Sequence, residues 1–429
     1  MPWSIMRHQG VNLPPVYTPV GKIKYKGEYI SLTPLCEEYL VYWFRLKLVH
    51  RNDEVVLQNF LRDMRKIQGK TKITPEFLKD RSVRAQCFRL GTNFTQSVKV
   101  SNIVKVDDLK YSVNNNIDIP GIFIGKGNHP LRGKMKTRIH AGDIVVNGTC
   151  PSTAHNGQRW KGKVQSYDSY YIACWKDPLF NKMKYIYVTS DQESKYIECQ
   201  KLKRHLNRIR RKIDEDLVSP DEKLRKLACI VYMIDKLCFR VGHEKDEQSS
   251  DSVGCCTLLI KNVKILPDNY IEFDFFGKSY IRFKKKVKMD ESVVNVIREC
   301  TVSRGDCEEL FDTSAVSVNN YLNKLMPGLT AKMFRTCNAS KLCYLHLKNK
   351  TTIKELKEVF MKVATLCNHK RKKKNSYIID TMTTKKNYID PRIVYAFCHK
   401  NGININLVYS EALQEQHKWA SSVPDTFMY

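Results

Sequence analysis

The chain has 429 residues, with 73 Lys and Arg against 44 Asp and Glu, which gives a formal net charge of +29. Hydrophobic residues make up 42% and aromatic residues 10%, so the chain can build packed cores and global disorder is excluded. The longest apolar run, at 227–234, has about eight residues against the roughly 20 that span a bilayer, so we expect no membrane-spanning segment and no membrane partner. The first ten residues lack the pattern of a signal peptide, so secretion is not expected either.

The 15 cysteines suggest no metal site or disulfide framework. They are scattered singly apart from the pair Cys255 and Cys256, and no C-x-x-C spacing occurs. Reduced thiols in an intracellular protein are therefore the simplest interpretation. The basic surplus predicts a polyanionic partner, and nucleic acid is favoured because the cations are interleaved with the sequence of folded elements.

The first 190 residues predict a mixed region. Short β-like runs occur at 144–147, 170–174 and 185–188, among loops and a helix at 31–48. A charged and polar stretch near 190–195 predicts a domain boundary.

A basic helix is predicted at 201–213, where seven residues are Lys or Arg. Four apolar residues share one helical face: Leu202, Leu206, Ile209 and Ile213. The basic face fits a solvated surface and a phosphate-facing surface equally well.

The next helix is predicted at 219–240. The run SPDE at 219–222 offers Ser219 as the N-cap, a proline in the first turn and a glutamate at the capping-box position. Gly242 is available to end the helix. Arg240 is therefore expected at the end of a rigid, apolar helix.

Three strands are predicted at 257–265, 270–276 and 279–287. Turn residues separate them, with the sequence PDN at 267–269 and Gly-Lys at 277–278. Lys278 therefore lies at a hairpin tip.

Residues 316–368 predict helices, the last of which begins with the capping-box pair Thr352 and Glu355. His369 follows the end of that helix. The run KRKKK at 370–374 then breaks the helical pattern.

Tyr388 precedes a predicted helix that begins with Asp390 as N-cap and Pro391 in the first turn and stops near Gly402. Because helix N-termini attract anions, Tyr388 is well placed to meet a phosphate.

Five polar groups stand beside the ends or turns of these elements, in the order Arg240, Lys278, Arg335, His369 and Tyr388. This order resembles the active site of the eukaryotic type IB DNA topoisomerases and, more distantly, that of the tyrosine recombinases. The segments that carry the resemblance are IDKLCFRVGHEKDE, DSVGCCTL, IEFDFFGKSYIR, GLTAKMFRTCNAS, ATLCNHKR and NYIDPRIVYAFCHKNGI. In the first half, GIFIGKGNHPLRGKMKTRI (121–139) resembles the cap-region signature of that family, and YTPVGKIKYKGEYISLTP resembles its start.

The chain departs from the family pattern in its connections. Only 18 residues (370–387) separate His369 from Tyr388, too few for the family's long coiled-coil linker, although extended they would reach roughly 50 Å. We also expect a compact form without the charged N-terminal extension of the cellular enzymes. Lys126 stands where the family usually has Arg, and Ser279 where it usually has Asp.

The resemblance implies an α+β fold arranged as a two-lobed DNA clamp. A mixed α/β N-terminal cap lobe would face a mainly helical catalytic lobe of the tyrosine recombinase/topoisomerase IB type, which carries a three-stranded β element. The expected parts are a DNA-binding cap lobe at 1–190, a catalytic core at 191–369, a short basic linker at 370–387, and a C-terminal segment at 388–429 that carries the nucleophilic tyrosine.

The resemblance also implies a chemistry: ATP- and metal-independent relaxation of supercoiled duplex DNA through transient cleavage of one strand, rotation and religation. Tyr388 would form a 3′-phosphotyrosyl bond, while Arg240 and Arg335 clamp the non-bridging oxygens of the phosphate. His369 would donate a further hydrogen bond, and Lys278 would protonate the leaving 5′-oxygen. No metal and no other cofactor is expected.

Double-stranded DNA is the expected partner, contacted mostly through its backbone. The residues expected to make these contacts are Lys126, Asn128, His129, Arg132, Lys134, Lys136 and Arg138 in the cap, and Lys203, Arg204, Lys245 and Asn387 elsewhere. A monomer located in the nucleus is expected, or in a cytoplasmic factory if the protein is viral.

Two alternative functions compete with this interpretation. A tyrosine recombinase or integrase shares the catalytic order but lacks the GKGNHP cap region and joins two DNA sites in a multimer. A catalytically silent DNA-binding protein would not need all five polar groups to be intact.

Overall fold

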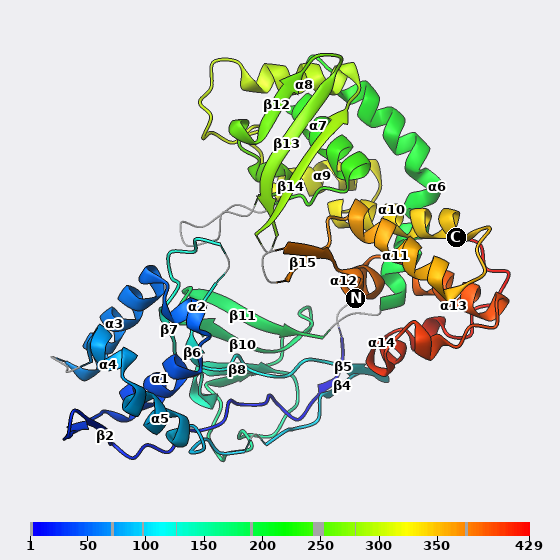
Figure 1. Ribbon diagram of the computed structural model, residues 1–429. Helices are drawn as coiled ribbons and strands as arrows, with labels where there is room; N and C mark the ends of the chain where they lie inside the picture. The colour runs from blue at the N-terminus through cyan, green and yellow to red at the C-terminus, as the bar shows by residue number, and fades with distance from the viewer. Residues whose placement is uncertain are drawn as a thin grey trace. The chain divides into compact units, whose positions relative to one another are not determined.

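The computed structural model describes residues 3–69, 73–96, 98–125, 127–188, 192–242, 253–278, 280–373 and 376–429. The expectations for Lys126, Lys245 and Ser279 therefore lie outside the described residues. Contacts within the chain divide it into two compact units, unit 1 at Met1–Ser190 and unit 2 at Asp191–Tyr429 (Figure 1). Helices and sheets occur in both units, so the expected α+β class is confirmed.

One half of unit 1 is helical. It contains α1 (Pro34–Arg45), α2 (Leu48–Arg51), α3 (Glu54–Gln68), α4 (Pro75–Lys79) and α5 (Arg81–Leu90), with the hairpin of β2 (Lys22–Tyr25) and β3 (Glu28–Ser31). Trp43 of α1 stacks on Phe60 of α3 with ring centroids 4.4 Å apart, inside the core of this half. The helix predicted at 31–48 is shorter in the structure, because the Thr33 side chain accepts a hydrogen bond from the Cys36 amide and so α1 begins three residues later, at Pro34.

The other half of unit 1 is built from sheets. One sheet has the order β1 (Met6–Arg7), β4 (Ile103–Val106), β5 (Leu109–Ser112), and a second has the order β11 (Lys182–Tyr187), β10 (Tyr171–Asp177), β8 (Ile144–Asn147), β9 (Gly162–Val164). The short pair β6 (Gly121–Ile122) and β7 (Met135–Lys136) packs instead on the core of the helical half, through Ile122 and Met135. Trp3 and Trp175 lie in the core of this half. The strands predicted at 144–147, 170–174 and 185–188 are confirmed as β8, β10 and β11.

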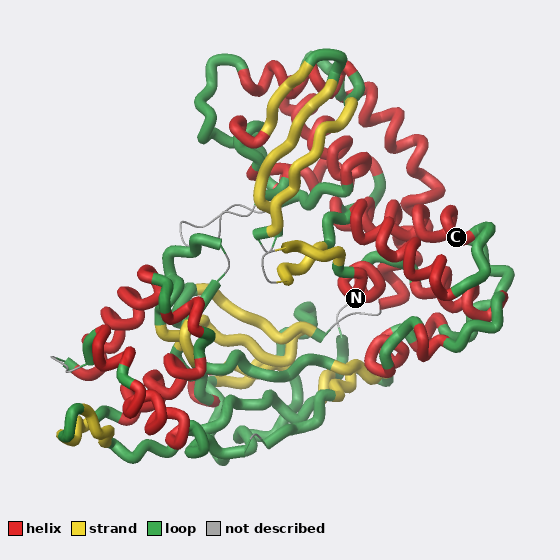
Figure 2. Tube along the Cα trace, viewed as in Figure 1, coloured by secondary structure: helices red, strands yellow, loops and turns green. Residues whose placement is uncertain are grey.

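Unit 2 is mainly helical and contains one three-stranded sheet and one two-stranded hairpin (Figure 2). Its helices are α6 (Gln192–Asp216), α7 (Glu222–Leu237), α8 (Glu291–Thr301), α9 (Ala315–Leu325), α10 (Ala331–Leu347), α11 (Ile353–Leu366), α12 (Thr381–Asn387), α13 (Pro391–Lys400) and α14 (Glu411–Gln416). Its strands are β12 (Val263–Leu266), β13 (Tyr270–Gly277), β14 (Ile281–Lys288), β15 (Lys370–Lys373) and β16 (Ser376–Ile379). Among the described residues, none of the helices is long and apolar enough to cross a membrane.

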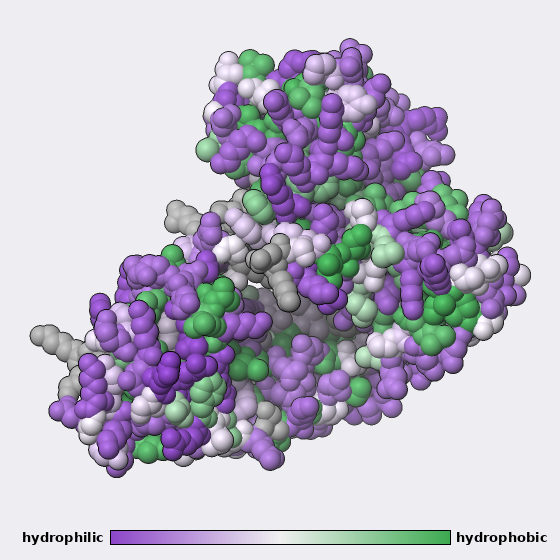
Figure 3. Space-filling model, in the orientation of Figure 1, coloured by the Kyte–Doolittle hydropathy of each residue, from purple (hydrophilic) through white to green (hydrophobic). Residues whose placement is uncertain are grey.

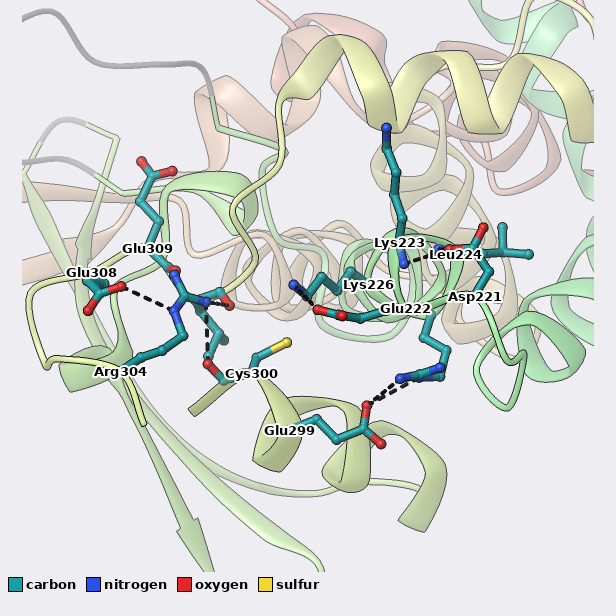
Figure 4. A network of polar contacts seen from close by, with 12 residues as sticks. Asp221, Glu222, Lys223, Leu224, Lys226, Glu299, Cys300, Arg304, Glu308 and Glu309 are labelled. Atoms are coloured by element: carbon teal, nitrogen blue, oxygen red, sulfur yellow. Dashed lines mark hydrogen bonds and ion pairs between the residues drawn. The ribbon is translucent and has the colours of Figure 1, made fainter. Parts of the chain in front are cut away.

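The basic helix predicted at 201–213 is part of α6, which packs against α7. Its predicted apolar face is confirmed, since all four members are buried: Leu202, Leu206, Ile209 and Ile213. The predicted start of α7 is wrong, because Asp221 and not Ser219 is the N-cap. The Asp221 carboxylate accepts hydrogen bonds from the amides of Lys223 and Leu224 (Figure 4).

Ion pairs tie the start of α7 to α8, and a polar network orders the segment that follows α8. Arg225 pairs with Glu299 of α8 at 3.0 Å. Arg304 donates to the backbone oxygens of Cys300 at 3.4 Å and Glu309 at 2.7 Å, so the loop after α8 is fixed by one guanidinium (Figure 4).

The sheet β12–β13–β14 is antiparallel, and its mixed sequence leaves a mostly hydrophilic outer surface (Figure 3). The first strand begins later than the predicted 257–265, because Cys255–Thr257 and Ile260–Asn262 form 3₁₀ turns instead. Asp268 and Asn269 adopt left-handed φ values of 59° and 62° in the first hairpin turn, as expected for residues that tolerate this conformation.

The helices predicted within 316–368 are confirmed as α9, α10 and α11, and the capping box between Thr352 and Glu355 is present. The short connection at 370–387 is not extended: it forms the hairpin β15–β16 followed by α12. The predicted start of α13 is confirmed, with Asp390 as N-cap and Pro391 in the first turn.

We predict that Gly133→Ala destabilises unit 1 far more than Gly157→Ala does. Both glycines have positive φ values, +86° and +78°, so both alanines incur about 1–2 kcal/mol of backbone strain. A Cβ at residue 133 would also lie 2.2 Å from the backbone oxygen of Val56, whereas nothing lies within 4 Å of one at residue 157. Urea unfolding should show a loss of roughly 2–5 kcal/mol for Gly133→Ala. Equal losses for the two variants would contradict the close approach of this backbone to α3.

Candidate active site

A cavity of about 870 Å³ lies within unit 2. The five residues singled out from the sequence all line it: Arg240, Lys278, Arg335, His369 and Tyr388. They come from five places in the chain, namely the segment after α7, the β13–β14 turn, α10, the segment after α11, and the residue that follows α12. The structure therefore brings together side chains that are up to 148 residues apart in sequence.

Tyr388 is held by hydrogen bonds to its backbone on both sides. Its amide donates to the carbonyl of Thr384 at 3.0 Å, which completes the last turn of α12. Its carbonyl accepts a hydrogen bond from the Ser340 hydroxyl of α10 at 3.1 Å, and the same hydroxyl accepts from the Asp390 amide at 2.9 Å. The Tyr388 side chain is only 5% exposed, so the phenol is oriented within the cavity wall.

Arg240 lies beyond α7 and not at its end, which corrects the sequence prediction. The helix ends at Leu237 because Cys238 adopts a left-handed φ of 54°. The carbonyl of Arg240 then accepts a hydrogen bond from the Cys255 amide at 2.8 Å, so a neighbouring segment positions this residue. Its Nη1 donates to the Tyr388 hydroxyl at 3.3 Å.

Arg335 and His369 lie against the ring of Tyr388. The Arg335 guanidinium carbon is 5.0 Å from the ring centroid, and the His369 and Tyr388 ring centroids are 4.9 Å apart. Arg335 Nη2 donates to the carbonyl of Cys367 at 3.1 Å. Within the described residues, Arg335 Nε and His369 Nε2 are buried and have no hydrogen-bond partner. Two nitrogens beside one tyrosine are therefore available to a ligand.

Lys278 lies in the turn between β13 and β14, as predicted, and is exposed. Gly277 and Ile281 form the last residue pair of the hairpin ladder. Phe276 and Tyr280 stack with ring centroids 4.3 Å apart and so order the base of the turn. The ammonium group can therefore move at the edge of the cavity while its hairpin stays fixed.

The cavity is strongly positive. Its charged lining residues are five cations and one carboxylate: Arg240, Lys278, Lys332, Arg335, Lys370 and Asp380. Among the described residues, neither Arg240 nor Arg335 has an ion pair with a carboxylate. Burial, with the charge of Arg335, lowers the pKa of Arg240 from its ordinary value. Burial, with Arg335 and Arg240, lowers the pKa of His369 to about 3, so this imidazole is neutral near pH 7.

The sequence did not indicate several residues that support the site. Lys195 of α6 donates to the carbonyl of Asn387 at 2.9 Å, and burial together with Lys332 lowers its pKa to about 8. Thr384 is fully buried, with its hydroxyl 2.7 Å from His369 Nδ1. In the sequence, the only indication that Thr384 supports the site is its position one helical turn before Tyr388. Lys332, which lies three residues before Arg335 on α10, could have been found from that spacing.

Basic residues of the 121–139 segment have acidic partners within unit 1. Arg132 pairs with Asp53, Lys134 with Asp63 at 2.8 Å, Lys136 with Asp118 at 3.7 Å, and Arg138 with Glu38 at 2.5 Å. These pairs hold the segment against its neighbours. A role for these cations in binding DNA remains a prediction and would require each of them to be shared between a phosphate and a carboxylate.

His129 and Asn128 differ in exposure. His129 is buried, with its ring against Phe123 and its Nδ1 accepting from the Leu131 amide at 3.1 Å. Asn128 is exposed. The ring of His129 is thus packed within unit 1, and a DNA contact by either residue remains a prediction.

The remaining predicted DNA contacts lie in unit 2. Arg204 is exposed on α6, and the ammonium group of the half-buried Lys203 lies 5.0 Å from the ring centroid of Tyr429. Asn387 lines the cavity beside Tyr388. Across the described ranges, no group of three or more Cys, His, Asp or Glu side chains is placed to hold a metal ion.

Three family models match the chain. The model described as eukaryotic DNA topoisomerase I, DNA binding fragment, matches residues 1–82 and 93–188. The model described as eukaryotic DNA topoisomerase I, catalytic core, matches residues 182–393 and so includes the whole cavity. The C-terminal topoisomerase domain matches residues 361–429.

Named relatives agree with these matches. The chain is 28% identical to DNA topoisomerase 1 alpha of Arabidopsis thaliana over 544 aligned residues, which cover 100% of this chain and 59% of the relative. It is 26% identical to DNA topoisomerase 1 of Homo sapiens, over 99% of this chain and 71% of the relative. It is 30% identical to DNA topoisomerase 1 of Candidozyma auris, over 86% of this chain and 55% of the relative. The chain thus spans less than two thirds of the length of the Arabidopsis relative.

We predict that His369→Gln weakens the pH dependence of stability between pH 7 and pH 5. The pKa of His369 is about 3 in the folded chain and about 6.5 when unfolded, so the unfolded state binds more protons across this interval. Acidification therefore destabilises the folded wild type, by about 2 kcal/mol at pH 5 from this group. Urea unfolding at both pH values should show a smaller loss in the variant.

The exposed His346 of α10 provides the matched control, because His346→Gln should keep the wild-type slope. Other buried histidines contribute equally to every variant and cancel in the comparison. If His369→Gln loses as much stability on acidification as the wild type, His369 has the same pKa in the folded and unfolded chain, which contradicts the lowered pKa.

Proposed function

Because the chain belongs to the eukaryotic DNA topoisomerase I family, of type IB, we propose that it relaxes supercoiled duplex DNA through transient cleavage of one strand. The observation that carries the proposal is the environment of Tyr388. A phenol that receives a hydrogen bond from Arg240 lies beside two buried nitrogens without partners, in a cavity large enough for a phosphodiester. This arrangement suits a nucleophile that attacks an anion.

In the proposed reaction, the Tyr388 oxygen attacks a backbone phosphorus atom and displaces the 5′-oxygen of the next nucleotide. A tyrosine–phosphorus bond forms as the phosphorus–oxygen bond breaks, so a 3′-phosphotyrosyl link stores the bond energy and no ATP is consumed. The phenolic proton leaves to solvent as the neighbouring guanidinium groups stabilise the phenolate. Religation is the same step in reverse.

Arg240, Arg335 and His369 are proposed to bind the non-bridging oxygens of the phosphate. Negative charge grows on these oxygens in the transition state, and preorganised donors then stabilise it more than they stabilise the ground state. The orientation of Arg335 by the Cys367 carbonyl supports this role, because its unpaired Nε remains available to the substrate.

Lys278 is proposed to donate a proton to the leaving 5′-oxygen. Its exposed position on a hairpin turn at the edge of the cavity allows it to reach an atom on the far side of the phosphorus from Tyr388.

We further propose that unit 1 is the DNA-binding cap lobe and that the two units close around the duplex as a clamp. The match of residues 1–82 and 93–188 to a DNA-binding fragment supports this assignment. The proposed division of unit 2 is the catalytic core at 191–369, the short basic linker at 370–387 and the nucleophile segment at 388–429. A monomer that acts in the nucleus on double-stranded DNA completes the proposal.

The central test is the relaxation of a supercoiled plasmid in EDTA without ATP. The wild type should produce relaxed topoisomers, and Tyr388→Phe should produce none, because phenylalanine has no nucleophilic oxygen. Tyr344→Phe is the matched control, since Tyr344 lies on α10 outside the cavity lining and should retain activity. Relaxation by Tyr388→Phe at the wild-type rate would refute the proposal.

The role of Lys278 predicts rescue by an altered leaving group. Lys278→Ala should cleave ordinary DNA slowly but cleave DNA with sulfur at the 5′-bridging position at nearly the wild-type rate, because a thiolate leaves without being protonated. Arg335→Ala should not be rescued, since its proposed contacts are with non-bridging oxygens. Single-turnover cleavage of the two substrates measures both effects. Failure of the sulfur substrate to rescue Lys278→Ala, or equal rescue of Arg335→Ala, would exclude the general-acid assignment.

A further inference from the structure

Thr384 connects two of the proposed catalytic residues. Its hydroxyl oxygen lies 2.7 Å from Nδ1 of His369. Its carbonyl accepts hydrogen bonds from the amides of Tyr388 at 3.0 Å and of Ile389 at 3.2 Å. One residue therefore contacts the imidazole through its side chain and the nucleophile segment through its backbone.

The direction of the hydrogen bond between Thr384 and His369 follows from burial. Thr384 is fully buried, and within the described residues the imidazole is the partner of its hydroxyl. A buried hydroxyl hydrogen without an acceptor is costly, so the hydroxyl donates to Nδ1. Nδ1 must then carry a lone pair, which places the proton of the neutral ring on Nε2.

His369 Nε2 is where this proton matters. The nitrogen is buried without a partner among the described residues, in a side chain that is 5% exposed and lines the cavity. An Nε2–H group can donate to a phosphate oxygen. In the opposite tautomer, Nε2 would present a lone pair to that oxygen and would repel it.

We propose that Thr384 is a positioning residue, which fixes His369 in the Nε2–H tautomer so that the imidazole donates a hydrogen bond to a non-bridging oxygen of the scissile phosphate. The inference rests on the proposed function for its substrate, while the tautomer itself is a property of the free protein.

The short 370–387 connection places Thr384 opposite His369. The Asp380 amide donates to the His369 carbonyl at 2.8 Å and so closes the base of the β15–β16 hairpin. The Asp380 carboxylate then caps α12 by accepting from the Met382 amide at 3.1 Å. Thr384 lies one turn into this helix. Backbone hydrogen bonds thus fix both partners of the Thr384–His369 contact.

The first experiment determines the tautomer. Nitrogen-15 NMR of the full chain, with labelled histidine and His369→Gln for assignment, should show a protonated Nε2 and an unprotonated Nδ1 in the wild type and in Thr384→Ser. Thr384→Val removes the hydroxyl at constant shape and should lose this fixed pattern. A wild-type spectrum with the proton on Nδ1 overturns the proposal without reference to any variant.

The second experiment measures single-turnover cleavage of a DNA duplex. Thr384→Val should cleave about 10- to 100-fold more slowly, the loss that accompanies a missing buried hydrogen bond, while Thr384→Ser stays close to the wild type. Thr365→Val is the matched control, since this exposed threonine of α11 donates only to the backbone of its own helix and the change should leave cleavage intact.

A double-mutant cycle separates positioning from general destabilisation. If Thr384 acts through the imidazole, Thr384→Val should cost nothing further in a His369→Gln background. Additive losses, or an unchanged rate for Thr384→Val alone, overturn the proposal. If the wild type fails to relax DNA while the Nε2–H tautomer is present, the proposed function fails and the assignment of the tautomer stands.

Discussion

The cavity around Tyr388 depends on two guanidinium groups placed beside this tyrosine without a carboxylate to neutralise them. Arg335 is almost fully buried and Arg240 half-buried, and among the described residues neither has an acidic ion-pair partner. Removing an ion from water costs several kcal/mol even in a relaxed protein site. The desolvation of these two guanidinium groups therefore lowers the stability of the folded chain. A bound phosphate recovers that penalty because it supplies the missing opposite charge at the point where the cations converge.

Several cations outside the cavity, in contrast, have carboxylate partners. In unit 1, Arg132 and Arg138 of the 121–139 segment have carboxylate partners. In unit 2, Arg210 of α6 pairs with the buried Asp235 at 2.7 Å. Each of these cations is offset by a carboxylate of its own unit, so the pairs add nothing to the net charge of +29. The overall charge therefore explains attraction to a polyanion, while the unpaired guanidinium groups of the cavity explain where a single phosphate would be bound.

The sequence predicted which residues line the cavity better than it predicted the contacts that position them. The resemblance to the type IB topoisomerases singled out Arg240, Lys278, Arg335, His369 and Tyr388, and all five line the cavity. The position of Arg240 was predicted wrongly, because its backbone is set by Cys255, a contact that neither helix propensity nor capping can show. The N-cap of α7 was also misplaced, since Ser219 and Asp221 are both good caps and only the local backbone decides between them.

The role of Thr384 could not be predicted from the sequence, because this residue contacts His369 only after the chain reverses direction through the β15–β16 hairpin. That hairpin also shows how a connection of 18 residues can serve where the family pattern has a long linker. The ladder begins at Lys370 and Ile379, and the hydrogen bond between Asp380 and His369 closes it on the side of the cavity. The contacts that orient His369 and Tyr388 therefore lie at the two ends of the connection, at Asp380 and at Thr384.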